Sequence, residues 1–172
     1  MRRTLAIAAL LWCVAAAAHA QGTLRVYGDY PNVTVTGTLT ETILASVPIP
    51  AGAMPANGMA RLTWTATMTN NADTKTINLR YGTAAGVTGA VISNSVQTTI
   101  ATQQSIWILR NRGVTNGQTI YGTNVPYGTT TNGNSSPSLD STAATFMNIT
   151  ATLTNVADSI TLNGWTLEVI MP

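Results

Sequence analysis

The stretch RLTWTATMTNNADTKTINLRYG, residues 61–82, alternates apolar and polar residues in both of its halves. A period of two places successive side chains on opposite faces of a β-strand. The Asn-Asn-Ala-Asp cluster between the halves favours a turn. The stretch therefore predicts a β-hairpin, with Lys75, the chain's only lysine, just past the turn on a solvated face. The predicted inward positions are Leu62, Trp64, Ala66, Met68, Ile77, Leu79 and Tyr81.

Other segments also have the character of strands, and no segment after residue 20 shows a sustained helical period. These segments are 34–47, 105–110, 118–121, 144–154 and 160–171. Gly37 and the pair Asn163-Gly164 mark predicted bulges, and 105–110 is predicted to be a central strand. In 144–154 the expected inward residues are Met147, Ile149, Ala151 and Leu153, and the expected outward residues are Asn148, Thr150 and Thr152. Trp64, Trp107 and Trp165 are predicted to pack in the core.

The connecting segments 48–58, 82–89 and 113–143 are rich in proline and glycine. Six to eight strands at this spacing predict an all-β fold, a single antiparallel β-sandwich of jelly-roll type. We expect this domain to cover residues 33–172. Residues 21–32 are expected to form an extended N-terminal arm and not a core strand.

The first twenty residues have the pattern of a helical signal peptide. Arg2 and Arg3 precede an apolar run, and Ala18-His19-Ala20 is a small-x-small cleavage pattern. We expect cleavage between Ala20 and Gln21, export to the periplasm, the medium or the cell surface, and no stable membrane span afterwards. The alternative, an N-terminal anchor helix, needs a longer apolar run.

Charge and residue inventory exclude several kinds of function. Removing 20 of the 172 residues leaves 152, with six basic and six acidic residues, so nucleic-acid binding loses its support. The only cysteine and histidine, Cys13 and His19, leave as well. Catalytic triads and zinc sites of the usual kind are then impossible, and no cofactor, metal site or enzymatic activity is predicted. A glycosidase-like carboxylate pair stays open, although the six acids, Asp29, Glu41, Asp73, Asp140, Asp158 and Glu168, have the spacing of surface or capping residues.

Two aromatic residues are the candidate ligand-binding positions. Tyr121 and Tyr127 lie in TIYGTNVPYGTTTNGNSSPS, a long, uncharged and glycine-rich segment. Binding residues concentrate on such loops, and tyrosine can stack on a sugar. The alternative is a loop with a purely structural role.

The scarcity of charged residues bears on how the edges of the predicted sheets are protected. Charged residues make up 8% of the chain, whereas about 25% is usual, so the strands lack the charges that protect edges from pairing. We therefore expect a homo-oligomer, with a trimer favoured. Such a molecule would act by assembly or by attachment to a surface, and a glycan is a possible partner.

Two long segments carry a family resemblance. ETILASVPIPAGAMPANGMARLTWTATMTNNADTKTINLRYG and MNITATLTNVADSITLNGWTLEVI, within residues 41–110 and 144–171, resemble β-sandwich domains of tailed-phage virion proteins, such as head-decoration or tail-fibre modules. The resemblance implies a structural or receptor-binding role, trimeric assembly and location in a virion, and no catalytic residue is carried over. The signal peptide departs from this pattern. The second hypothesis is therefore a secreted bacterial adhesin or carbohydrate-binding module.

Overall fold

The computed structural model describes residues 23–122 and 137–172, and every helix or strand within them is a β-strand. The predicted leader and its cleavage position, Ala20 and Gln21, lie outside the described residues. The strands are β1 (Thr23–Asp29), β2 (Val33–Thr36), β3 (Thr42–Ile49), β4 (Met59–Met68), β5 (Lys75–Gly82), β6 (Ala90–Gln97), β7 (Thr102–Asn111), β8 (Gln118–Gly122), β9 (Thr145–Leu153) and β10 (Ser159–Met171).

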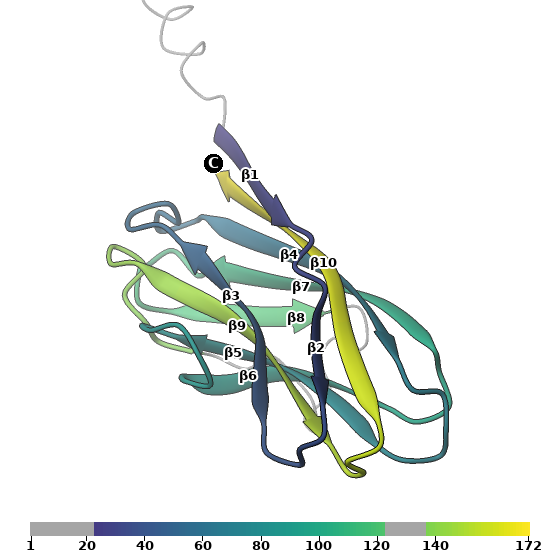
Figure 1. The fold of residues 1–172 in the computed structure, drawn as a ribbon. Coiled ribbons are helices and arrows are strands. Elements are labelled where there is room, and N and C mark those ends of the chain that lie inside the picture. The colour runs from purple at the N-terminus through teal and green to yellow at the C-terminus, as the bar shows by residue number, and fades with distance from the viewer. Residues whose placement is uncertain (1–22, 123–136) are drawn as a thin grey trace, which may run out of the picture.

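The strands form two antiparallel sheets that lie face to face (Figure 1). Sheet A has the order β1-β10-β4-β7-β8, with β2 also paired to β10, and sheet B has the order β3-β9-β5-β6. The apolar side chains of both inner faces make one core between the sheets. The predicted all-β antiparallel sandwich is therefore confirmed.

The inward positions predicted in 61–82 are confirmed, but the hairpin is wrong. All seven predicted inward side chains are buried. However, β4 pairs with β10 and β7 in sheet A, whereas β5 pairs with β6 and β9 in sheet B. The turn at 69–74 therefore crosses from one sheet to the other. Alternation shows which face of a strand is buried, but it does not show whether consecutive strands lie side by side or face to face.

The segment predicted as one bulged strand, 34–47, is two strands in different sheets. β2 pairs with β10 in sheet A, and β3 pairs with β9 in sheet B. Gly37 ends β2 at a φ of 73°, a left-handed conformation that favours glycine, and its N–H donates to the carbonyl of Val156 at 3.0 Å. It marks a break between strands and not a bulge.

Two further predictions differ from the structure in sheet B. β6 was not among the predicted strands, because its inward positions Ile92 and Ser95 do not keep a period of two. Asn148 and Thr150 in β9 were expected to face solvent, yet both are buried. The 83–89 loop and Glu41 cover that outer face, since they accept hydrogen bonds from Asn148 and Thr150.

The bulge predicted in the last strand is confirmed. The register between β10 and β4 shifts between Leu162 and Gly164, which moves the inward phase by one residue. Trp64 and Trp107 are buried with ring centroids 5.0 Å apart, whereas Trp165 is only partly buried against the core. β7 lies between β4 and β8, as expected of a central strand.

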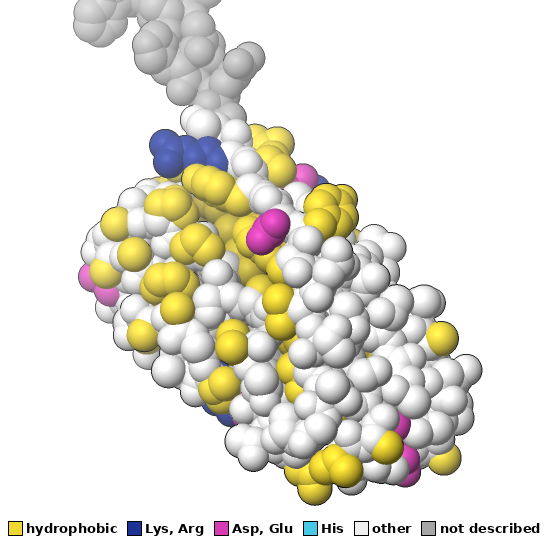
Figure 2. All heavy atoms as spheres, in the orientation of Figure 1, with side chains coloured by type: hydrophobic (Ala, Val, Ile, Leu, Met, Phe, Trp, Pro, Cys, Tyr) yellow, Lys and Arg dark blue, Asp and Glu magenta, His cyan; other side chains and the backbone are white. Residues whose placement is uncertain are grey.

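Residues 23–29 of the expected N-terminal arm form β1, which pairs with residues 165–171 of β10. Most of its side chains are exposed, and β1 lies at the outer edge of sheet A, beside β10 (Figure 1). The surface in the same orientation carries few charged side chains (Figure 2). The division at residues 32 and 33 stays a prediction.

Candidate binding site

A hollow of about 380 Å³ lies at one end of the β7–β8 pair. Its lining comes from the loop before β4, the end of β7, the following turn and β8. The lining residues are Asn57, Arg110, Asn111, Arg112, Gly113, Thr119 and Tyr121. This site combines an aromatic ring, two guanidinium groups and uncharged hydrogen-bonding groups.

Strand register places these side chains together. Arg110 lies opposite Thr119 and Ile108 lies opposite Tyr121 in the antiparallel pairing of β7 with β8. Directly opposite residues share a face of the sheet, and alternate residues along a strand also share it. Since Ile120 is buried on the inner face, the Arg110 and Tyr121 side chains lie on the outer face of sheet A.

A buried polar network supports the hollow from behind. The Asn111 side-chain amide lies 2.9 Å from the carbonyl of Met54 and 2.9 Å from the Ser141 hydroxyl. Gln118 Nε2 donates to Asn111 Oδ1 at 2.9 Å and lies 2.9 Å from the carbonyl of Leu139. Because Asn111, Gln118 and Ser141 are almost fully buried, these bonds fix three chain segments against one another and limit movement of the hollow's floor.

The charges of the hollow are unbalanced. Three ion pairs are present among the described residues, and they are Arg61–Glu168, Lys75–Asp158 and Arg80–Glu41. The three other cations of that part of the chain, Arg25, Arg110 and Arg112, have no carboxylate partner within it. Two of these three line this hollow, and none of its lining residues is acidic. It is therefore a positively charged site on a chain with little net charge.

Of the two predicted ligand-binding residues, Tyr121 lines the hollow and is half-buried. Tyr127 lies outside the described residues, so its role stays a prediction. Sequence reasoning did not identify Arg110, Arg112 or Asn57. The available signal was the pair of arginines that flanks Asn111 just after an apolar run, within a chain that has very few charges.

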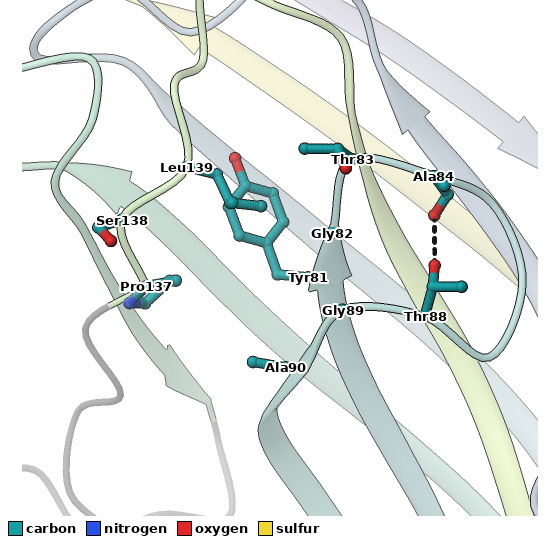
Figure 3. A pocket seen from close by; sticks show the side chains of 10 residues that line it. All are labelled: Tyr81, Gly82, Thr83, Ala84, Thr88, Gly89, Ala90, Pro137, Ser138 and Leu139. Carbon is teal, nitrogen blue, oxygen red and sulfur yellow. Dashed lines mark hydrogen bonds between the residues drawn. The ribbon is translucent and has the colours of Figure 1, made fainter.

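A second hollow, of about 410 Å³, lies where the β5–β6 connection meets residues 137–139 (Figure 3). Tyr81 and Leu139 lie close together there, and the Thr88 hydroxyl donates to the carbonyl of Ala84 at 2.8 Å. Burial raises the pKa of the Tyr81 phenol. The lining contains no charged residue, so this hollow offers fewer means of selecting a ligand than the first.

Lys75 has a structural role different from the one predicted. It is 1% exposed, and its Nζ donates to Asn71 Oδ1 at 2.5 Å and to the carbonyl of Asp73 at 2.7 Å, and lies 3.5 Å from Asp158 Oδ2. The solvated position predicted for Lys75 is therefore wrong, as is the surface or capping interpretation of Asp158, which is also 1% exposed. The signal was available, because Lys75 has the same phase as inward-facing Ile77.

This buried lysine has the contacts of a structural residue. An ammonium group has three N–H donors, and each has an acceptor here. Asn71 Nδ2 in turn donates to Asp158 Oδ1 at 2.6 Å, and Asn155 Nδ2 donates to Asp73 Oδ2 at 2.8 Å. The cluster ties the β4–β5 turn to the β9–β10 turn.

Glu41 lies on the outer face of sheet B. Its carboxylate accepts hydrogen bonds from Arg80 Nε at 2.8 Å, from Asn78 Nδ2 at 3.0 Å and from the Thr150 hydroxyl. These bonds, with that of Arg80 the strongest influence, lower the pKa of Glu41 from 4.5 to about 2. Glu41 is thus an ion-paired residue and not a free surface acid. Asp140 does cap a turn, since its Oδ1 accepts from the Thr142 N–H at 2.9 Å.

Within residues 23–122 and 137–172, no three histidine, cysteine, aspartate or glutamate side chains gather closely enough to hold a metal ion. The same parts of the chain contain no helix with the length and apolar character to span a membrane.

No protein-family model and no curated protein sequence matches this chain. Among solved structures it is similar to a protein of the disulfide-linked pili of Bacillus endospore appendages, with 14% identity, a TM-score of 0.38 and coverage of 88% of this chain and 90% of that one. It is also similar to the CBM36-1 domain of a multidomain xylanase from the hindgut metagenome of Trinervitermes trinervoides, with 11% identity, a TM-score of 0.42 and coverage of 86% and 96%.

A third similar structure is the VP2 subviral particle of infectious bursal disease virus, with 11% identity, a TM-score of 0.42 and coverage of 88% of this chain and 33% of that one. The likeness in all three concerns the β-sandwich fold alone. No residue role is carried over from them.

Proposed function

We propose that this chain is an exported, non-enzymatic binding module that takes an acidic carbohydrate in the hollow of Arg110, Arg112 and Tyr121. The observation that supports this proposal is the placement of two arginines, which have no carboxylate partner in the described part of the chain, beside a half-buried tyrosine. Because no acidic residue lines the hollow, an anionic ligand would meet attraction and no opposing charge.

Each part of the hollow has a use in binding such a ligand. A guanidinium group binds a carboxylate through two parallel hydrogen bonds, which fits a uronate or another acidic sugar. The Tyr121 ring offers an apolar face for the sugar ring. Asn57 and Thr119 offer donors and acceptors for hydroxyl groups. The network of Asn111, Gln118 and Ser141 would limit the ordering cost of binding.

Titration calorimetry with uronate-containing and neutral oligosaccharides tests this function. We expect the uronate-containing ligands to bind and the binding to weaken as salt is raised. Tyr121→Ala and Arg110→Gln should each lower the affinity by at least about tenfold, since each removes a direct contact. Arg110→Lys, which keeps the charge but loses the planar fork, should fall between Arg110→Gln and the unchanged protein.

Arg25→Gln is the matched control, because it removes the same charge from the only other unpaired cation of the described residues. It should leave the affinity per site unchanged. Equal affinity for acidic and neutral ligands, or unchanged binding in an Arg110→Gln/Arg112→Gln variant, would contradict the proposal.

A structural module of a virion, as a decoration or fibre protein, is the second candidate. The observation that favours it is the open edge of sheet A at β1, which suits assembly with other copies. Neighbouring genes for capsid, portal and tail proteins would support this role. Neighbouring genes for secretion or surface polysaccharides would support the secreted adhesin. The predicted trimer belongs to this candidate and is tested by light scattering.

A further inference from the structure

β1 is an edge strand with an unprotected side. Among the described elements it pairs only with β10, so the backbone groups along its other side have no strand partner. Leu24 is 55% exposed and Val26 is 58% exposed. β1 contains no lysine, proline or bulge to keep it from pairing with another chain, and its only charged residues are Arg25 and Asp29, which have opposite charges.

The position of β1 leaves room for a second strand. β1 lies on the side of β10 opposite β4, at the outer edge of sheet A (Figure 1), and hydrophobic side chains lie on both sides of β1 in the surface view (Figure 2). Another chain could therefore approach the free edge without meeting sheet B.

We propose that β1 pairs antiparallel with β1 of a second copy, around a twofold axis at Tyr27, so that the two sheets A become one continuous sheet. In this register Arg25 lies opposite Asp29 of the partner subunit. The symmetric contact places Asp29 opposite Arg25 of the partner subunit. Leu24 lies opposite Tyr30 of the partner subunit in the same way. A twofold interface needs such a self-complementary surface.

Charge complementarity selects this partner and this register. Among the described residues, Arg25 has no carboxylate partner, and the Asp29 carboxylate accepts only the adjacent N–H of Tyr30, at 2.8 Å. Both residues face the same side of the strand, because they are four positions apart. Opposite residues in an antiparallel pair have Cβ atoms about 4.5–5.5 Å apart, which is close enough for an ion pair.

Other registers lose this match. Moving the axis by one residue along the strand places Arg25 opposite Pro31 or Tyr27 of the partner subunit. A half-step places it opposite Tyr30 or Gly28 of the partner subunit. Only the axis at Tyr27 pairs both charges of both copies. Pairing of β1 with an unrelated chain would not require Arg25 and Asp29 to be complementary to each other.

Sedimentation and light scattering on the protein purified from cells that express the full chain test the pairing. The unchanged protein should dimerise at micromolar concentration, or form an assembly built from dimers. Arg25→Asp places two pairs of like charges across the axis, and Asp29→Arg does the same with opposite sign. Each variant alone should weaken dimerisation by at least about tenfold.

The two variants also provide the decisive control. In an equimolar mixture, a dimer of one Arg25→Asp copy and one Asp29→Arg copy has both ion pairs restored. The mixture should therefore dimerise as the unchanged protein does, and so should the double variant Arg25→Asp/Asp29→Arg. Both side chains are exposed, and circular dichroism checks that the fold is kept.

Three results would overturn the proposal. They are a monomer at all accessible concentrations, an oligomer that neither variant weakens, and weakened variants that do not recover on mixing. Acidic-sugar binding at the Arg110 hollow is measured on a different surface, so either proposal can fail while the other stands.

Discussion

Lys75 and Asp158 form an ion pair in which both side chains are removed from water. Taking two charges out of water costs several kcal/mol, and the attraction between them offsets this cost only when the remaining hydrogen bonds are also made. Asn71 supplies such bonds, since its Oδ1 accepts from Lys75 and its Nδ2 donates to Asp158. The pair is therefore a strong constraint on how the two turns meet, even if its net contribution to stability is small.

Asp158→Asn should destabilise the fold by about 3–5 kcal/mol, because it leaves the ammonium of Lys75 buried without its counter-charge. The free energy of unfolding in urea measures this loss. Asp140→Asn, which changes an exposed turn cap, should cost much less than Asp158→Asn. A loss below about 1 kcal/mol for Asp158→Asn would mean that the buried pair forms no important link.

At the scale of the element, the β5–β6 connection depends on one close approach of backbone. Gly89 has a φ of 83°, and a Cβ atom there would lie 2.3 Å from the carbonyl oxygen of Tyr81. Gly86 in the same loop has a φ of 104°, but a Cβ atom there would meet nothing within 4 Å. A comparison of alanine substitutions at the two glycines therefore distinguishes the cost of backbone strain from the cost of steric overlap.

Gly89→Ala should destabilise the protein by about 2–4 kcal/mol, since it combines strain with a clash against backbone. Gly86→Ala should cost only the strain, about 1–2 kcal/mol. The difference between the two urea midpoints gives the cost of the overlap. Equal losses would show that the loop moves aside without difficulty.

Alternation predicted most of the inward residues in the strands that it identified, but it missed Ile92 in β6 and did not show which strands pair. Leu62 and Leu79 are buried as expected, yet their strands lie in opposite sheets. The choice between a hairpin and a crossing depends on strands far away in sequence, such as β9 and β10. Lys75 differs from the prediction for another reason, since a lysine side chain usually faces solvent, whereas its phase in β5 places it on the inner side with Ile77.

The candidate site, like the fold, could be predicted from the sequence only in part. Tyr121 could be identified from its glycine-rich surroundings, because loops of that kind often carry binding residues. The hollow itself could not, since Asn57 and Arg110 come together only through the pairing of β4 with β7, in which Met59 lies opposite Arg110. Neither residue type nor local sequence indicates that Asn57 and Arg110 lie together.

At the scale of the whole molecule, we expect low pH to lower the free energy of unfolding. The carboxyl groups of Glu41 and Glu168 both have a lowered pKa, in each case chiefly through the hydrogen bond from an arginine. A carboxyl group with a lowered pKa in the folded state stabilises the fold fully above its unfolded pKa. That stabilisation is lost as the pH falls through the folded pKa.

The free energy of unfolding should therefore be nearly constant from about pH 6 to 8, because no residue after His19 is of a type whose side chain ordinarily titrates in this range. It should fall from about pH 4.5 toward pH 2. Glu41→Gln should be less stable at pH 7 and should show a shallower fall below pH 4.5. Urea unfolding across this range measures both effects. A fall that is equally steep in Glu41→Gln would assign it to other groups.

β10 supplies a final consequence. This last strand of the chain lies inside sheet A, where it pairs with β4 on one side and with β1 and β2 on the other. β1 and β2 therefore have no strand partner in sheet A until residues 159–171 have left the ribosome, so this sheet cannot close before that stage of synthesis.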